Sequence, residues 1–395
     1  MNVAAFFLFV LFLSAAGFLG LFLFGIWRRQ QVYCGCRDFL PPVSIIKPLC
    51  GVDDQLEENL TSFFQLDYPE YEIIFSLAHP GDPALAVARR VADRHRSVRS
   101  VFVVDGRDAF PNPKVNRLEA GLGRARFRLM LFSDGNVRVR PDFLRPAVAA
   151  FHDSRVGLVS HLFRGSWPRT LASRLECLYL NTVLQVGTAA IAAAGQPCVV
   201  GKSILISREA LEAIGGLRSV GDYLAEDFLI GTLVRRAGYR VLLSHDVLDT
   251  AEISRSFAGV WGRHRRWAMM RRRLGGAGYA AELLGSPLLV FLACVLTAGA
   301  DPTPTLLSSA LLLLGARYLA EAAALTFRGG AAALGTLWML PARDVFAAGV
   351  FFAGLLGQTT SWRGHRVRLG ALSRIETQGS LRPWRARPVP TLEPG

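Results

Sequence analysis

Three acidic positions and one basic, aromatic motif of this sequence could together handle a phosphorylated substrate. Asp82 lies just after an apolar run, Asp134 ends a strongly hydrophobic run, and Asp227 lies in an Ala-Glu-Asp-Phe segment. The motif Arg263-His264-Arg265-Arg266-Trp267 follows later in the chain. Carboxylates bind hard cations or accept protons, and arginines neutralise phosphate charge. Because an aspartate after a strand is more often a turn or helix-cap residue, only the combination predicts chemistry.

Alternating strand and helix patterns place the first two aspartates at one edge of a predicted sheet. Strands are predicted at 43–46, 71–77, 98–104 and 128–133, and helices at 55–64, 83–95 and 115–123. Repeated strand–helix units predict an α/β domain with a mainly parallel sheet, whose ligand lies at the carboxyl ends of the strands. Asp82 and Asp134 follow such ends, so they are placed for chemistry.

Apolar blocks on both sides of this domain predict membrane-spanning helices. Residues 4–27 are long enough to cross ~30 Å of hydrocarbon, and the arginines after them predict a cytoplasmic α/β domain. Segments 284–300 and 305–327 each resemble a span, whereas 331–357 is interrupted at Pro341, so a re-entrant hairpin is an alternative there. The predicted divisions are an anchor (1–28), the α/β domain (41–255), interfacial helices (256–282), a C-terminal membrane region (283–362) and a basic cytosolic tail (363–395).

The composition agrees with a membrane protein that has a folded soluble part. The 395 residues include 45 Lys or Arg and 31 Asp or Glu, for a net charge of +14, and 51% are hydrophobic. This apolar content argues against disorder. Beside membrane spans, the positive charge favours an anionic lipid surface or nucleotide phosphate over nucleic acid. Lys47, Lys114 and Lys202 are the only lysines; a GC-rich genome would explain the excess of arginine, but each lysine lies in a segment that stands out for another reason.

Spacing excludes two nucleotide-binding motifs and a zinc site. No G-x-G-x-x-G follows the first predicted strand, so a dinucleotide fold is not expected. Gly201-Lys202-Ser203 is not a P-loop, because the required earlier glycine would occupy position 196, which is Gln196. The six cysteines show no C-x-x-C spacing, so we expect no zinc and a reduced, cytosolic setting.

The order of the acidic residues and the later motif resembles the D, D, D, (Q/R)xxRW signature of processive and lipid-directed glycosyltransferases with the GT-A fold. Further segments resemble the ceramide glucosyltransferase family (glycosyltransferase family 21), including its bacterial hopanoid-associated members. These segments are 47–53, 64–69, 112–116 and 362–364. The resemblance runs from about 41 to 275 and resumes near 362.

This resemblance implies the inverting transfer of a hexose from a UDP-sugar to a hydroxyl of a membrane lipid. The diphosphate leaves with extra negative charge, which a divalent cation (Mg²⁺ or Mn²⁺) would stabilise. By resemblance, Asp134 and Asn136 would lie on the metal side, and Asp227 would be the general base, with Glu226 as an alternative. UDP-glucose or UDP-N-acetylglucosamine would be held by Asp82, Lys114, Asn116, Arg263, Arg266 and Trp267.

The acceptor and the wider function have alternatives. Animal members of the family carry a histidine after a Leu-Glu-x-x-Tyr segment, where this sequence has Leu184, so a hopanoid polyol and a ceramide are both candidates. A processive polysaccharide synthase and a non-catalytic membrane scaffold are the other classes. The resemblance implies a multi-pass protein of the bacterial inner membrane with a cytoplasmic catalytic domain. Arginines between 263 and 273 are expected to face anionic headgroups.

Overall fold

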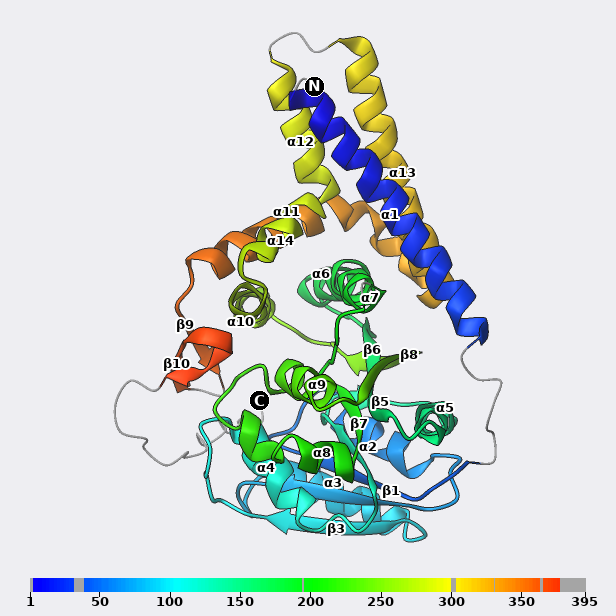
Figure 1. Cartoon of the computed structure of the whole chain (residues 1–395), viewed down its shortest axis with the longest axis vertical. Coiled ribbons are helices and arrows are strands. Elements are labelled where there is room, and N and C mark those ends of the chain that lie inside the picture. Colours follow the sequence, from blue (N-terminus) through cyan, green and yellow to red (C-terminus); the bar gives the residue numbers. More distant parts are fainter. Residues whose placement is uncertain are drawn as a thin grey trace, which may run out of the picture.

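An α/β domain forms one end of the molecule and an apolar helical stalk forms the other (Figure 1). The computed structural model describes residues 3–31, 39–193, 195–299, 303–329, 331–362 and 365–376. The stalk consists of α1 (Val3–Gln31), α12 (Pro287–Ala298) and α13 (Pro304–Gly329). Leu11 and Val290 are buried between these helices. The apolar blocks before and after the α/β domain therefore pack against each other.

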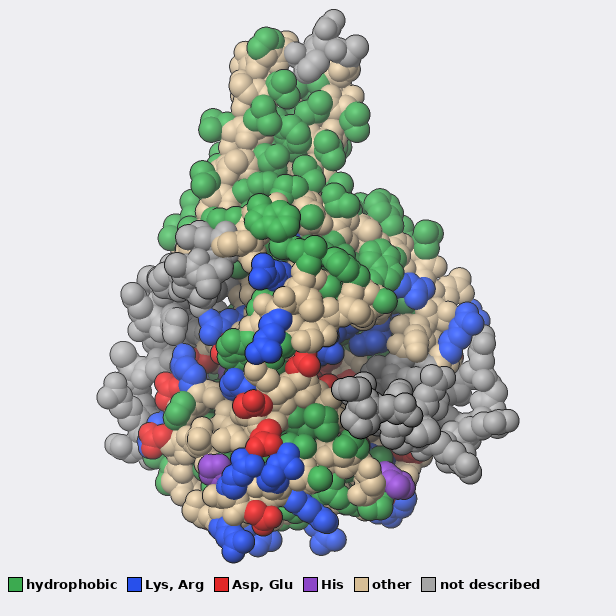
Figure 2. Space-filling view, turned by 180° about the vertical axis from the view of Figure 1, so that it is seen from behind, with side chains coloured by type: hydrophobic (Ala, Val, Ile, Leu, Met, Phe, Trp, Pro, Cys, Tyr) green, Lys and Arg blue, Asp and Glu red, His purple; other side chains and the backbone are tan. Residues whose placement is uncertain are grey.

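Side-chain types follow the same division (Figure 2). Hydrophobic side chains cover the stalk, whereas charged side chains gather on the α/β domain and at the junction. Among the described residues, four helical segments are long and apolar enough to cross a membrane: Val3–Gly20, Leu171–Ala192, Pro304–Thr326 and Gly335–Leu356. A pair of helices bent by 57°, Phe257–Leu283 with Pro287–Ala298, is a further candidate.

The α/β domain is built on an eight-stranded sheet in the order β3-β2-β1-β4-β7-β6-β8-β5. Strands β3, β2, β1 and β4 are parallel, β7 runs antiparallel between β4 and β6, and β6 pairs in parallel with β8. The bounds are β1 Val43–Pro48, β2 Tyr71–Leu77, β3 Arg99–Val104, β4 Leu129–Ser133, β5 Val137–Arg138, β6 Val156–Ser166, β7 Ser203–Ser207 and β8 Arg240–Ala251. The predicted α/β class and mainly parallel sheet are confirmed.

Helices cover both faces of this sheet because its central strands are apolar on both sides. Along β1, Ile45 joins one buried cluster and Ile46 joins the other, as the two-residue side-chain period of a strand requires. Residues of α2 (Leu56–Phe64), α3 (Pro83–Arg94) and α5 (Leu144–Ala149) pack in the first cluster. Those of α4 (Pro113–Leu122), α8 (Arg208–Ala213) and α9 (Glu226–Arg236) pack in the second. Short 3₁₀ turns lie at Ala150–His152 and Leu217–Val220.

A long helical segment inside the α/β region was not predicted as a candidate span. It consists of α6 (Leu171–Tyr179), a π-helical turn η2 (Leu180–Leu184) and α7 (Gln185–Ala193). It lies between the sheet and the stalk (Figure 1). Its alanine-rich second half lacks the charges that a solvent-facing helix usually carries. The α/β domain is therefore connected to the membrane-type helices in two ways: through the α6–η2–α7 segment in the middle of its sequence, and through the segments that precede and follow the domain.

Further helices lie across the junction between the stalk and the domain. They are α10 (Phe257–Gly275), η4 (Gly276–Ala280), α11 (Ala281–Leu284), η5 (Ala331–Met339) and α14 (Leu340–Leu356). Helix α14 runs across the base of the stalk (Figure 1). It begins around Pro341, a residue that fits the first turn of a helix because its missing N–H has no helical partner there.

The predicted basic tail is folded in its first part. Strands β9 (Thr359–Trp362), β10 (His365–Leu369) and β11 (Ile375–Glu376) form a small antiparallel sheet, with a 3₁₀ turn at Ala371–Ser373. The Ser373 hydroxyl accepts a 3.0 Å hydrogen bond from the Ala225 N–H, just before α9. This sheet therefore braces the segment that carries Asp227. Positions 363–364 and 377–395 of the predicted tail lie outside the described residues.

Candidate active site

A cavity of about 1260 Å³ lies between the sheet and the membrane-type helices. Seven of the nine predicted site residues line it: Lys114, Asp134, Asn136, Asp227, Arg263, Arg266 and Trp267. Apolar residues such as Leu289, Ala347 and Phe351 line the same cavity at α12 and α14. One continuous space therefore joins the charged cluster to the helices of the junction and the stalk.

Lys114 is the centre of the charged cluster. Its Nζ lies 3.1 Å from Asp134 Oδ1 and 3.0 Å from Glu226 Oε1, and it donates to the Gly201 carbonyl oxygen at 3.1 Å. Asn112 caps the helix that carries Lys114, accepting from the N–H groups of residues 114 and 115. Burial alone would lower the pKa of Lys114, but the surrounding carboxylates raise it overall. The ammonium group therefore stays charged.

Asp134 is held by two lysines at the end of β4. Its second oxygen, Oδ2, lies 3.2 Å from Lys202 Nζ, and the same ammonium donates to Asn136 Oδ1 at 2.8 Å. Burial alone would raise the pKa of Asp134, but Lys114 and Lys202 lower it well below its usual range. The carboxylate is therefore ionised, with one ammonium partner on each oxygen.

The remaining lysine approaches the same turn from the core. Lys47 is fully buried at the end of β1, where its Nζ donates to the Asp134 carbonyl oxygen at 3.0 Å and the Ser133 hydroxyl at 3.3 Å. Its ammonium lies 3.5 Å from the centroid of the Phe63 ring. Burial lowers the pKa of Lys47 well below its usual range. Lys47 thus fixes the backbone that presents Asp134.

Asp227 lies in the first turn of α9 and points toward Gly201. Its Oδ2 accepts a 2.7 Å hydrogen bond from the Gly201 N–H. Burial, followed by the Glu226 carboxylate, raises the pKa of Asp227 to about 6, although Lys114 opposes the shift. A side chain at position 201 would clash, because an added Cβ would lie 2.9 Å from Asp227 Oδ2 and 3.0 Å from Lys114 Nζ. A raised carboxyl pKa in a cavity is typical of a general base.

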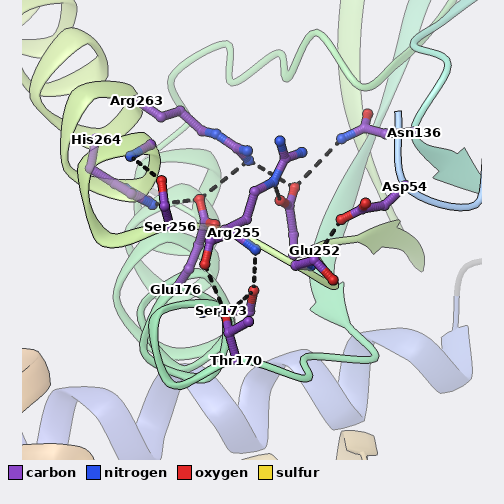
Figure 3. Close-up of polar contacts among 12 residues, drawn as sticks. Asp54, Asn136, Thr170, Ser173, Glu176, Glu252, Arg255, Ser256, Arg263 and His264 are labelled. Atoms are coloured by element: carbon purple, nitrogen blue, oxygen red, sulfur yellow. Dashed lines mark hydrogen bonds and ion pairs between the residues drawn. The ribbon is translucent and has the colours of Figure 1, made fainter. Parts of the chain in front are cut away.

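Two buried glutamates hold the arginine-rich helix α10 beside this cluster (Figure 3). Arg263 Nη1 lies 2.8 Å from Glu252 Oε1 and 3.2 Å from Glu176 Oε1. His264 Nε2 is 3.1 Å from Glu176 Oε1. Glu252 also accepts from Asn136 Nδ2 at 3.5 Å. Arg263 is therefore engaged inside the protein, and Glu252 connects α10 to the turn after β4.

Other arginines of α10 also have partners within the chain. Arg271 pairs with Glu282 at 2.7 Å, and Arg273 donates to the Leu369 carbonyl oxygen at 2.6 Å. Arg266 donates to the Ser361 carbonyl oxygen at 3.4 Å, from a position at the cavity wall beside Trp267. Part of the arginine set that the sequence assigned to lipid headgroups thus holds α10 to its neighbours.

Asp82 and Asn116 lie outside the cavity lining. Asp82 caps α3 by accepting from the Ala84 N–H at 2.9 Å, and its two oxygens accept from the Gly51 N–H at 3.0 and 3.1 Å. Asn116 exchanges hydrogen bonds with the backbone of Phe110 at 2.9 and 2.8 Å. Both residues fix loops at the cavity rim, since Gly51 lines the cavity and Asn116 also donates to the lining residue Asp108.

The contacts around Asp134 and Asn136 do not fit a preformed divalent-cation site. Each Asp134 oxygen already has an ammonium partner, and Asn136 Oδ1 accepts from Lys202. Two ammonium groups at these distances would repel a divalent cation. Among the side chains that the structure describes, no group of three or more His, Cys, Asp or Glu could hold a metal ion.

Five residues of this site were not predicted as site residues: Lys47, Glu176, Gly201, Lys202 and Glu252. The only sequence signal for Lys202 was the rarity of lysine, because its Gly-Lys-Ser segment failed the P-loop spacing. Glu176 and Glu252 are fully buried, and a buried carboxylate is recognisable only once its partners are known.

The charged cavity thus opens onto apolar, membrane-type helices. The family model of Glycosyl transferase family 21 matches residues 7–375, so the chain belongs to this family. Ceramide glucosyltransferase 1 of Caenorhabditis elegans is 29% identical over 238 residues, which cover 59% of this chain and 50% of that protein. Ceramide glucosyltransferase of Komagataella phaffii is 30% identical over 224 residues, 50% of this chain and 43% of that protein. The chain spans about half the length of these curated relatives.

Solved structures of glycosyltransferases are also similar. The mannosyltransferase PcManGT from Pyrobaculum calidifontis, in complex with GDP-Man and Mn²⁺, has a TM-score of 0.49 and 21% identity, covering 89% of this chain and 99% of that one. S. aureus TarS 1–349 in complex with UDP-GlcNAc has a TM-score of 0.38 and 14% identity, covering 83% and 96%. The predicted family and the α/β architecture with a mainly parallel sheet are confirmed.

Proposed function

We propose that this chain transfers one hexose, glucose or N-acetylglucosamine, from a UDP-sugar to a hydroxyl of a membrane lipid. The observation that carries the proposal is the single cavity in which Asp227 and Lys114 share a wall with the apolar residues of α12 and α14. A soluble nucleotide sugar can enter from the α/β side, while the acceptor stays in the bilayer. The acceptor is a hopanoid polyol or a ceramide.

In the proposed reaction, the acceptor oxygen attacks the anomeric carbon on the face opposite the diphosphate. Asp227 takes the proton of that hydroxyl, the bond between the anomeric carbon and the diphosphate oxygen breaks, and UDP leaves. A single carboxylate base gives inversion at the anomeric carbon. The Gly201 N–H, 2.7 Å from Asp227 Oδ2, orients the carboxylate. Glu226 pairs with Lys114, so its carboxylate is less available as the base.

Some of the other predicted residues contact the donor directly, and others position the elements around it. Lys114 neutralises the diphosphate, and Arg266 and Trp267 close the cavity wall around it. Arg263, paired with Glu176 and Glu252, positions α10. Asp82 and Asn116 shape the rim loops that receive the nucleoside. We place the protein in the bacterial inner membrane with the α/β domain in the cytoplasm and exposed arginines on anionic lipid.

Family resemblance adds a divalent cation, Mg²⁺ or Mn²⁺, on the side of Asp134 and Asn136. In this hypothesis the cation would neutralise the diphosphate and would have to displace Lys202 from both residues. In a competing hypothesis, a lysine supplies this charge.

A matrix of two donors and two acceptors tests the proposed function. The protein, purified in lipid nanodiscs, is incubated with UDP-glucose or UDP-N-acetylglucosamine and with a hopanoid polyol or a ceramide. We expect one combination to give a lipid heavier by a single hexose residue in mass spectrometry. A long polymer would instead identify a polysaccharide synthase, and a complete lack of transfer in all four combinations would reject the proposal.

A further inference from the structure

All three lysines of the chain converge on one short turn. Lys47 contacts the Asp134 backbone, Lys114 contacts Asp134 Oδ1, and Lys202 contacts Asp134 Oδ2 and Asn136 Oδ1. The other 42 basic residues, 45 minus these three, are arginines. A genome-wide preference for arginine does not explain why the exceptions meet at one place. The turn therefore requires lysine in particular.

The geometry of the turn explains this requirement. An ammonium group is a compact charge with three N–H donors, whereas a guanidinium group is a planar fork suited to bidentate partners. Lys114 meets oxygens from three separate places: the turn after β4, helix α9 and the loop before β7. The three N–H groups of one ammonium can each be directed at one of these oxygens.

Lys114 and Lys202, the two lysines that line the cavity, differ in how many of their N–H groups have an oxygen partner in the protein. Lys114 has three oxygen partners, Asp134, Glu226 and Gly201, which match its three N–H groups. Lys202 has two oxygen partners among the described residues, and it also lines the cavity. Lys202 therefore retains one donor for a ligand oxygen beside Asp134.

We propose that Lys202 is a catalytic residue that binds the diphosphate of the donor and supplies the charge expected from a divalent cation. In this inference, which rests on the proposed function, Asp134 and Asn136 hold an ammonium group rather than a metal ion. Lys114 keeps Asp134 in place, and Lys47 fixes the turn from the core. As the anomeric bond breaks, the electron pair moves to the diphosphate oxygen, and Lys202 stabilises that charge without a metal.

UDP binding in a chelator tests the proposal independently of the acceptor. The wild-type protein in nanodiscs is titrated with UDP by calorimetry in EDTA, and again with Mg²⁺ or Mn²⁺. We expect affinities within about twofold of each other. Lys202→Gln in EDTA should bind UDP about ten- to a hundredfold more weakly, the effect of losing one hydrogen bond from a charged group. Arg218→Gln, which removes an exposed charge paired with Glu119, is the control and should bind UDP like the wild type.

The outcomes separate this inference from the proposed function. If wild-type UDP binding and hexose transfer are both lost in EDTA and return with Mn²⁺, the inference is overturned while the proposed function stands. Unchanged UDP binding by Lys202→Gln would also overturn it. If UDP binds in EDTA and depends on Lys202, but no lipid is glycosylated, the inference stands and the acceptor assignment falls. The wild-type comparison needs no variant, and a thermal unfolding curve shows whether Lys202→Gln is folded.

Discussion

Two clusters of paired acidic and basic side chains contribute to the lining of one cavity, and they use different basic residues. The lysine cluster, defined as Lys47, Lys114 and Lys202 with Asp134, Glu226 and Asp227, lies in the α/β domain. The arginine network, defined as Arg317 and Arg343 with Glu321 and Asp344, lies between α13 and α14 in the membrane-type region. Each contains as many acidic as basic groups. The two clusters differ in the surroundings of their charged groups.

The arginine network is closed around Arg343, whereas its members Arg317 and Asp344 also line the cavity. Arg343 is fully buried, pairs with Glu321, and contacts Asp344 at 2.6 Å and the Thr182 hydroxyl at 2.7 Å. Tyr318 donates to Asp344 at 2.9 Å. These bonds tie α13, α14 and η2 together. Buried charges are stable when they are paired and hydrogen-bonded, so this network fixes the position of the helices.

The lysine cluster is open toward the cavity. Lys114, Lys202 and Asp227 all line the cavity, and Asp227 faces it with a raised pKa. A lysine ammonium has three rotatable N–H donors, so it can bind an additional ligand oxygen while keeping its existing partners. The comparison indicates that Arg343 holds the membrane-type helices together, whereas Lys114 and Lys202 present their charge to the cavity.

The largest expected effect is on the open cluster. Asp227→Asn removes the proposed base but preserves its shape, so the turnover of hexose transfer should fall about 10²–10⁴-fold. Thermal unfolding in nanodiscs should change little. Turnover within tenfold of the wild type would remove Asp227 from the mechanism.

The closed network should show the opposite behaviour. Arg343→Met leaves the buried Glu321 and Asp344 carboxylates without their shared partner, which should cost about 3–5 kcal/mol of unfolding free energy. Chemical unfolding in detergent measures this loss. Arg174→Met, on the exposed side of α6, is the matched control. Equal stability of the two variants would contradict the structural role of the network.

A smaller effect should come from the backbone between Asp227 and Lys114. Gly201→Ala would place a methyl group 2.9 Å from Asp227 Oδ2 and 3.0 Å from Lys114 Nζ. We expect turnover to fall by about tenfold or more, since misplaced catalytic groups lose rate steeply. Gly262→Ala in α10 meets no heavy atom within 4 Å and should retain wild-type turnover. Full activity of Gly201→Ala would show that the cluster tolerates displacement.

The smallest effect should appear in the pH profile. Because the pKa of Asp227 is raised to about 6, the proposed base is protonated below that pH, and kcat/KM should fall about tenfold per pH unit there. The same shift makes ionisation of Asp227 oppose folding, so its contribution reduces stability as pH rises from about 4 to about 6. A rate that stays constant down to pH 4.5 would contradict this assignment.

The sequence predicted the helices and strands better than it predicted which side chains meet in the folded protein. Short apolar, β-rich runs were sufficient to predict the parallel strands. The order of the acidic residues before the arginine–tryptophan motif, through its family resemblance, singled out Asp134 and Asp227, which both line the cavity. Lys202 was not predicted to contact Asp134, because that contact depends on β7 pairing antiparallel with β4 across a long insertion. The α6–α7 helix was also not predicted as a candidate span; its first half carries Arg174 and Glu176, and charged residues are rare in membrane spans. Buried charges that pair across a long stretch of sequence leave no local periodic pattern, so their contacts cannot be predicted from the sequence pattern.

The stereochemistry of the product tests the central claim most directly. The wild-type protein is incubated with a UDP-α-hexose and its lipid acceptor, and the anomeric proton of the glycolipid is examined by NMR. The account predicts a β-linked hexose, because one carboxylate base directs a single displacement. An α-linked product, or no glycolipid from any tested acceptor, would contradict it.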